Sequence, residues 1–373
     1  MGRTPSHPRP TGQALRVLDS LHDLVDLGTA QPEGHAGALA IGEILERLRV
    51  WQADFEAAQA PATLKAVRAD WGRYLAWCRG TGHSPLPASR EQLIAFLENA
   101  IDRGRKRSTV ARYLFTVSLI HDAAGLPNPA KDRRWPLAWK KLAKRLKASG
   151  GSHRSQVGAL VAADVDRILA TLGDDPRSLR DAALLSLASD TLLREAELVA
   201  VKVEHLHPDA HRESWSLWVP ASKTDQEGTR DDYRYVSPAT LARVRRWLAA
   251  ADIANGYVFR AIGGRKPAAV VAAEKAGLEP PVLSLTAKEV ARIFRQRAIA
   301  AGLGHAWSIS GHSTRIGSAN DLMRDGATTA EIQHAGGWKS EAMVIAYTRK
   351  SGAGHAAMAR LRRAATGTGH VPE

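Results

Sequence analysis

Four residues near the end of the chain have side chains that together could act on an anionic substrate. The stretch that begins at Gly311 contains His312, Arg315, Trp338 and Tyr347. His312 and Arg315 are three residues apart, a spacing that places both on one face of a helix. A guanidinium and an imidazole beside a phenol favour covalent chemistry on an anion, most simply a phosphodiester.

Capping residues and glycines predict three short helices that bring these side chains together. Ser310 can cap the first helix, which should end at Gly326. Thr328 and Glu331 have the spacing of a capping box for the second helix, which a glycine pair then ends. Ser340 can cap the third helix, and that helix carries the tyrosine.

Three more charged residues lie upstream. Arg194 and Glu197 belong to the motif TLLREAEL, within a largely apolar helix predicted for residues 180–200. Burying a guanidinium costs several kcal/mol unless it is paired, so an Arg–Glu pair at a helix end is the simplest structural explanation of this motif. Lys223 lies in the turn of a predicted hairpin, where a lysine is usually solvated.

The tyrosine is the natural nucleophile of the set, although each residue taken singly has an ordinary explanation as packing or surface charge. A tyrosine has a reference pKa of about 10, so only roughly one phenol in a thousand is ionised at neutral pH. Attack by Tyr347 on phosphorus therefore needs a proton acceptor, for which His312 is the best-placed candidate. The product would be a phosphotyrosyl ester, which stores the bond energy until a second hydroxyl reseals the strand.

The remaining residues can offset charge and move protons. Arg194 and Arg315 can each donate two hydrogen bonds to non-bridging oxygens as charge builds in the transition state. Lys223 can give a proton to the leaving 5′ oxygen, and Trp338 can donate its indole N–H to a phosphate oxygen. Glu197 would orient its neighbours. This set needs no metal, no ATP and no other cofactor.

The order of these residues resembles that of the tyrosine recombinases (phage integrase family). It runs Arg–x–x–Glu, a lysine in a hairpin, His–x–x–Arg, a tryptophan and a tyrosine. The similarity is strongest in SGHSTRIGSA and AEIQHAGGW. It extends to TLKAVRADWGRYLAWC and HDAAGLPNP, and so covers roughly Pro61–Arg363. Family members commonly have a second histidine where Trp338 stands, so the chain resembles the members that have tryptophan there.

This resemblance implies a site-specific DNA recombinase. Such an enzyme cuts and rejoins duplex DNA through a 3′-phosphotyrosyl intermediate and exchanges strands through a Holliday junction. Four protomers would assemble on two DNA sites, each with inverted half-sites, while a monomer or dimer would occupy a single site. The implied catalytic residues are Arg194, Glu197, Lys223, His312, Arg315, Trp338 and the nucleophile Tyr347.

Two other functions fit parts of the pattern. A DNA-binding protein could keep the fold without strand exchange, although all seven catalytic positions are filled. A type IB-like topoisomerase would nick and relax DNA without exchanging partners. A helix expected at about 354–365 argues against the topoisomerase, because it resembles an element that docks on a neighbouring protomer.

The predicted fold is mainly α, with a helical DNA-binding domain and a mixed α/β catalytic domain. Four or five helices form the first domain, and the last of them, Pro136–Lys147, should direct Leu137 into the core. The second domain is mostly helical, with a small antiparallel sheet formed by Trp215–Val219 and Asp232–Val236. The predicted divisions are a disordered extension at 1–35, a core-binding (SAM-like) domain at 36–149, a linker at 150–158 and the catalytic domain at 159–373.

The charge of the chain indicates that its partner is an acidic polymer. The formal net charge is +14 and the pI about 10.1. Between Arg103 and Lys147 there are thirteen lysines and arginines against two aspartates, a net charge of +11. By the resemblance, six basic residues contact double-stranded DNA. They are Lys65 and Arg68 on a major-groove helix, Arg105, Lys106 and Arg107 at the start of another helix, and Lys288, which replaces a base-reading arginine.

Cysteine count and hydropathy exclude several classes of protein. The single cysteine, Cys78, rules out a disulfide framework and a multi-cysteine zinc site. No apolar run is long enough to span a bilayer, and the N-terminus lacks the apolar region of a signal peptide. We therefore expect no membrane partner and a cytoplasmic protein. The family resemblance further implies a bacterial or phage protein that is associated with the nucleoid. The insertion Gly263–Pro281 has no counterpart in the resemblance.

Overall fold

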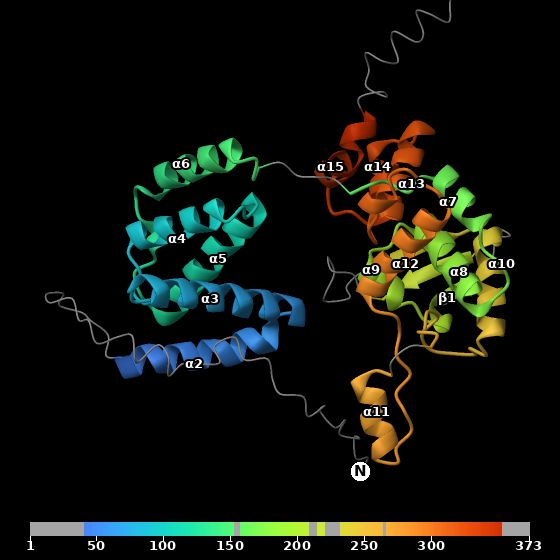
Figure 1. The fold of residues 1–373 in the computed structure, drawn as a ribbon, viewed down its shortest axis with the longest axis horizontal. Coiled ribbons are helices and arrows are strands. Elements are labelled where there is room, and N and C mark those ends of the chain that lie inside the picture. Colours follow the sequence, from blue (N-terminus) through green and yellow to red (C-terminus); the bar gives the residue numbers. More distant parts are fainter. Residues whose placement is uncertain (1–40, 153–156, 209–214, 221–231, 264–265, 353–373) are drawn as a thin grey trace, which may run out of the picture. The chain divides into compact units, whose positions relative to one another are not determined.

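The computed structural model describes residues 41–152, 157–208, 215–220, 232–263 and 266–352 (Figure 1). The chain divides into two compact units, Met1–Ser155 and Gln156–Glu373. The predicted disordered extension at 1–35, Lys223 and the predicted docking helix at about 354–365 lie outside the described residues. No helix in the described part is long and apolar enough to cross a membrane.

The first unit is helical throughout its described part. Its elements are α2 (Ile41–Ala58), α3 (Pro61–Thr81), α4 (Arg90–Asp102), α5 (Arg107–Ala124), the short 3-10 helix η1 (Pro129–Lys131) and α6 (Trp135–Ala148). Local sequence sets several helix ends. The Ser89 hydroxyl accepts a 3.1 Å hydrogen bond from the Gln92 amide and caps α4. Gly82 and Gly125 adopt left-handed conformations that end α3 and α5.

Apolar stripes of the five α-helices meet in one core. Tyr74 and Phe96 are both buried, with their rings edge-on and their centroids 5.0 Å apart. Asp70 of α3 is also buried, and its carboxylate accepts two hydrogen bonds, 2.5 and 2.9 Å long, from Arg112. This bidentate pair fixes α3 against α5.

The helix α6 buries a different face from the predicted one. Leu137 is 63% exposed, so its predicted place in the core is wrong. The buried residues are Trp135, Ala138, Leu142 and Leu146, whose spacing of three, four and four follows one face of a helix. The small Ala138 occupies the core position that we expected the larger leucine beside it to fill.

The second unit combines many helices with a small antiparallel sheet, which is the predicted fold class. Its elements are α7 (Ala162–Leu169), α8 (Pro176–Thr191), α9 (Glu195–Val199), η2 (Val203–His205), β1 (Leu206–Pro208), β2 (Trp215–Val219), β3 (Asp232–Val236), α10 (Pro238–Ala250), α11 (Ala268–Lys275), α12 (Ala287–Ala300), η3 (Ala306–Ser308), α13 (Ser313–Arg324), α14 (Thr329–Gly336) and α15 (Glu341–Gly352). The two predicted strands are confirmed, and α11 forms part of the insertion.

The sheet directs an arginine toward the interior of this unit. Its strand order is β1-β2-β3, and Leu217 of β2 pairs with Arg234 of β3. Because side chains alternate along a strand, Arg234 and Val236 are buried while Tyr233 and Tyr235 are exposed.

The helix predicted for residues 180–200 is in fact broken into α8 and α9. Leu192, with φ of 51°, adopts a left-handed conformation directly after α8, and Arg194 caps α9 in an extended conformation. A left-handed leucine is unfavourable by itself, so surrounding structure must stabilise it. Leu192 and Leu193 are both buried, and the Leu192 carbonyl accepts a hydrogen bond from Arg315 of α13. The break therefore places Arg194 at a helix start, facing α13.

Three short helices follow one another near the end of the described chain, as predicted. The capping box at the start of α14 is confirmed, because the Thr328 amide donates to Glu331 at 2.7 Å and the Glu331 amide donates to the Thr328 hydroxyl at 3.2 Å. The first helix begins later than predicted, with His312 in the capping position and the Ser310 hydroxyl accepting from the His312 amide. The helices share a small core that includes Ile332, Trp338 and Val344.

Candidate active site

The guanidinium of Arg315 is buried between the ends of two helices. The side chain is 1% exposed. Its Nη1 donates to the carbonyl of Leu192 at the end of α8, and its Nη2 donates to the carbonyl of Gly336, the last residue of α14, at 2.7 Å. The C-terminal ends of helices carry partial negative charge, so these carbonyls stabilise a buried cation. The Nε of Arg315 has no hydrogen-bond partner among the described residues.

Burial changes the acidity of this guanidinium. Removal from water lowers the pKa of Arg315 to about 10, and the nearby positive charge of Arg194 acts in the same direction. The carboxylate of Glu197 opposes both effects. Arg315 remains protonated at neutral pH, and an arriving anion would relieve the cost of burying its charge.

Trp338 and Tyr347 lie beside Arg315. The Cζ of Arg315 is 4.1 Å from the ring centroid of Trp338 and 5.9 Å from that of Tyr347, and the two rings are 5.2 Å apart. Trp338 is buried, and its indole Nε1 has no hydrogen-bond partner within the described part of the chain. A Cβ at position 336 would lie 2.1 Å from the indole, so the glycine there allows the Trp338 ring to pack against the backbone of residue 336. A buried N–H without a partner is costly unless a ligand accepts a hydrogen bond from it.

Arg194 and Glu197 form the i,i+3 pair that the sequence suggested, at the start of α9. The Arg194 Nη1 donates to Glu197 Oε1 at 2.6 Å, and the Arg194 amide donates to Oε2 at 2.9 Å. Both side chains are largely buried. The Glu197 carboxylate therefore accepts one hydrogen bond from the Arg194 guanidinium and holds that guanidinium near Arg315.

His312 is held by a residue that the sequence reasoning missed. Its Nδ1 is 2.7 Å from Oε2 of Glu195, the first residue of α9. The motif REAE contains two glutamates, and Glu197 already accounts for the pair with Arg194. The second glutamate, Glu195, had no partner assigned from the sequence, and this was the signal that it contacts another residue of the site.

A third buried arginine, Arg234, was also missed. Its guanidinium pairs with Asp232, with Nη2 2.5 Å from Oδ2, and lies against Gly337. Its charge is one of those that lower the pKa of Arg315. The alternation in DYRYV would have placed Arg234 on the same face as Val236, which was the signal for finding it.

The structure gathers six of the seven predicted catalytic residues around the junction of α9, α13, α14 and α15. These are Arg194, Glu197, His312, Arg315, Trp338 and Tyr347. The seventh, Lys223, lies outside the described residues. Among the predicted DNA contacts, Lys65, Arg105, Lys106, Arg107 and Lys288 are exposed and Arg68 is half-buried.

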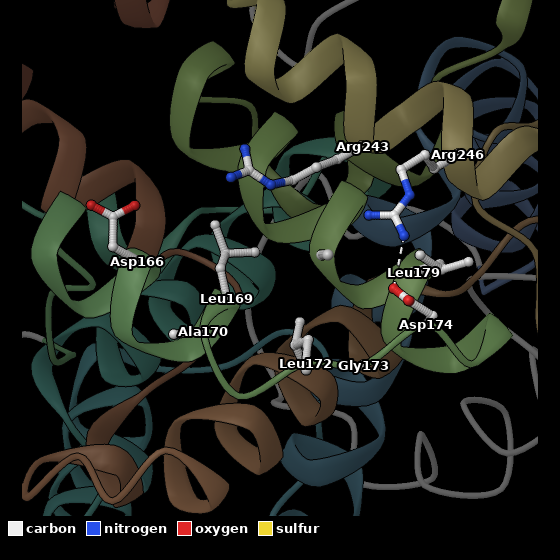
Figure 2. Close-up of a pocket in the computed structure, with 10 residues that line it drawn as sticks. Asp166, Leu169, Ala170, Leu172, Gly173, Asp174, Leu179, Arg243 and Arg246 are labelled. Atoms are coloured by element: carbon white, nitrogen blue, oxygen red, sulfur yellow. Dashed lines mark hydrogen bonds and ion pairs between the residues drawn. The ribbon is translucent and has the colours of Figure 1, made fainter.

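A separate cavity of about 340 Å³ lies between α7, α8 and α10 (Figure 2). Arg243 and Arg246 of α10 line it, and Arg246 pairs with Asp174 at 2.7 Å. None of the predicted catalytic residues lines this cavity. The described residues contain no group of three or more His, Cys, Asp or Glu side chains able to hold a metal ion.

Sequence comparison relates this chain to DNA-recombining proteins. The family model of the phage integrase family matches residues 159–353. Recombinase cre of Escherichia phage P1 is 26% identical over 295 residues, which cover 77% of this chain and 84% of the relative. The motif resemblance described above is to this member in particular. The integrase/recombinase xerD homolog of Selenomonas ruminantium is 30% identical over 302 residues, 78% of this chain and 82% of that protein.

Solved structures with low sequence identity share the fold. The XerH site-specific recombinase, bound to a palindromic difH substrate in a post-cleavage complex, has a TM-score of 0.60 at 13% identity and covers 95% of both chains. The Tn1549 transposon integrase in complex with transposon right-end DNA has a TM-score of 0.57 at 12% identity, covering 86% of this chain and 99% of the other.

Proposed function

Because this chain belongs to the phage integrase family and is a site-specific DNA recombinase, we propose that it cuts DNA with Tyr347 and forms a 3′-phosphotyrosyl intermediate. The observation that carries this proposal is the buried Arg315 beside Tyr347. Its guanidinium is held by two carbonyls and keeps an unpaired Nε, while the neighbouring Trp338 keeps an unpaired indole N–H. These donors are suited to a phosphodiester that arrives in the site.

The cleavage step exchanges one phosphoester bond for another. The Tyr347 oxygen attacks phosphorus, the bond from phosphorus to the 5′ oxygen breaks, and the phenol proton passes to Nε2 of His312. Lys223 donates a proton to the departing 5′ oxygen. Resealing reverses these steps, with a 5′ hydroxyl of the partner strand attacking the phosphotyrosine.

Two guanidiniums offset the charge that builds on the phosphate. Arg315 and Arg194 donate to the non-bridging oxygens, and Glu197 keeps Arg194 in place through its 2.6 Å contact. Trp338 supplies its indole N–H to a phosphate oxygen. Donors of this kind are each worth about 10²–10³-fold in rate, because they are already oriented before the charge develops.

Strand exchange requires four protomers on two DNA sites and proceeds through a Holliday junction. Each site carries inverted half-sites, a view supported by the palindromic substrate of XerH. Residues 36–149 form the core-binding domain and residues 159–373 the catalytic domain, with 150–158 as a linker between them. The segment 354–365, which lies outside the described residues, docks on a neighbouring protomer. The DNA contacts are Lys65, Arg68, Arg105, Lys106, Arg107 and Lys288.

Replacing Tyr347 by phenylalanine tests the proposal. The target sequence is first identified by crosslinking the protein to DNA and sequencing the bound DNA. On a nicked suicide substrate of that sequence, the wild type will form a covalent adduct and Tyr347→Phe will form none. The affinity for the same DNA should stay within about twofold, because the ring that packs near Trp338 is kept.

Tyr235→Phe is the matched control, since Tyr235 is an exposed tyrosine on β3. It should form the adduct at the wild-type rate. An adduct formed by Tyr347→Phe would show that another residue is the nucleophile, and a wild-type protein that binds its site without any adduct would contradict the proposed chemistry.

A further inference from the structure

Glu195 and His312 form a close pair beside the proposed nucleophile. The Nδ1 of His312 is 2.7 Å from Oε2 of Glu195, and the glutamate is 19% exposed while the histidine is 37% exposed. The two residues come from different elements, α9 and the capping position of α13. The pair therefore fixes the imidazole relative to the turn that also presents Arg194.

Gly311 makes room for this glutamate. A Cβ at position 311 would lie 2.0 Å from Cγ of Glu195 and 2.4 Å from its Oε1. Since real side chains never approach so closely, any larger residue at 311 would push Glu195 away from the histidine. The contact thus depends on a glycine next to His312 in sequence.

The two glutamates of the REAE motif have separate partners. Glu197 uses both carboxylate oxygens on Arg194, through its guanidinium and its amide. Glu195 contacts His312 instead. The acid that stabilises the arginine is therefore a different residue from the one that orients the histidine.

The chemistry of the pair determines which nitrogen of His312 carries the proton. A carboxylate can only accept a hydrogen bond, so Nδ1 must be the donor. In the neutral imidazole, the lone pair then lies on Nε2. That nitrogen is the one able to accept a proton from a phenol, and the carboxylate stabilises the imidazolium that results.

We infer that Glu195 is a positioning residue that holds His312 in the Nδ1–H tautomer, so that Nε2 accepts the proton of Tyr347 during DNA cleavage. This inference rests on the proposed function. The proton leaves the tyrosine oxygen and binds Nε2 as the bond from that oxygen to phosphorus forms. Glu195 itself touches neither DNA nor the reacting atoms.

The test combines nuclear magnetic resonance with single-turnover cleavage. The imidazole ¹⁵N shifts of His312, assigned with a His312→Gln variant of the full chain, report the tautomer without any reaction. The wild type should show a protonated Nδ1. Glu195→Ala should lose that preference and cleave a nicked suicide substrate about a hundredfold more slowly at unchanged DNA affinity.

Two variants separate positioning from folding. Glu195→Gln keeps an oxygen that can accept from Nδ1, so it should preserve the tautomer and lose less activity than Glu195→Ala. Glu91→Ala removes a first-turn glutamate of α4 that pairs with Arg90, and it should match the wild type in both measurements.

The inference is overturned if Glu195→Ala keeps the wild-type tautomer, or if its tautomer changes while cleavage does not. If the wild type forms no adduct at all, the proposed function fails, whereas the ¹⁵N shifts still show whether Glu195 sets the tautomer of His312. The two failures are therefore distinguishable.

Discussion

Arg315→Lys is expected to lower the single-turnover rate of DNA cleavage by about 10³-fold while leaving the chain folded. Lysine keeps the positive charge, but it is a point donor on a flexible stem. It cannot reach the carbonyls of Leu192 and Gly336, stack on the indole and still face a phosphate. Cleavage of a suicide substrate under enzyme excess, with DNA affinity measured separately, checks this expectation.

Arg324→Lys is the matched control for this prediction. Arg324 lies in the last turn of the same helix, is half exposed, and pairs with Asp321 at 3.3 Å. An exposed pair of this kind contributes little, so the substitution should change the cleavage rate by less than about twofold. If Arg315→Lys cleaves DNA at a rate within threefold of the wild type, the guanidinium of Arg315 is not essential for cleavage, which contradicts the prediction.

Gly317→Ala should have the largest effect on stability. A Cβ at position 317 would lie 1.6 Å from the carbonyl oxygen of Leu160 and 2.7 Å from the amide nitrogen of Val161. These are main-chain atoms, and the Leu160 amide also donates to the Ser313 carbonyl at 2.9 Å. The segment before α7 therefore cannot move away from α13 without losing that hydrogen bond. We expect a loss of about 3 kcal/mol or more in the second unit.

Hydrogen exchange of the α13 amides measures this loss, because it resolves the second unit from the first. Gly72→Ala is the control, since Gly72 lies within α3, is exposed, and has nothing within 4 Å of its added Cβ. That substitution should stabilise α3 by about 1 kcal/mol through helix propensity. Unchanged protection of α13 in Gly317→Ala would show that α13 and Leu160 are not packed so closely.

Local signals in the sequence predicted the features that local interactions determine. The capping box of Thr328 and Glu331 satisfies amides within four residues, so it forms wherever that helix forms. The alternation of Trp215–Val219 and Asp232–Val236 predicted the two strands for a similar reason, since neighbouring residues must face opposite sides.

Long-range interactions explain what the sequence did not reveal. Nothing in TLLREAEL marks Leu192 as left-handed, because its carbonyl is stabilised by Arg315, which lies 123 residues further along the chain. That break converts one predicted helix into two and places Arg194, Glu195 and Glu197 at a helix start. The contact of Glu195 with His312 depends on the same break, so pattern alone could not show it.

The family resemblance predicted the identities of the gathered residues better than their geometry. Arg315, Trp338 and Tyr347 were chosen by type and order, and the structure brings their side chains together. The resemblance could not show that Arg315 is held by helix ends rather than by a carboxylate, because this contact depends on how α8 and α14 end against α13.

The most direct test of Tyr347 as the nucleophile is to identify the residue that becomes attached to DNA. Wild-type protein is allowed to react with the nicked suicide substrate, the adduct is digested with nuclease and protease, and the peptide that retains nucleotide is sequenced by mass spectrometry. We expect a single modified peptide, with the 3′-phosphate on the oxygen of Tyr347. Nucleotide attached to any other residue would contradict it.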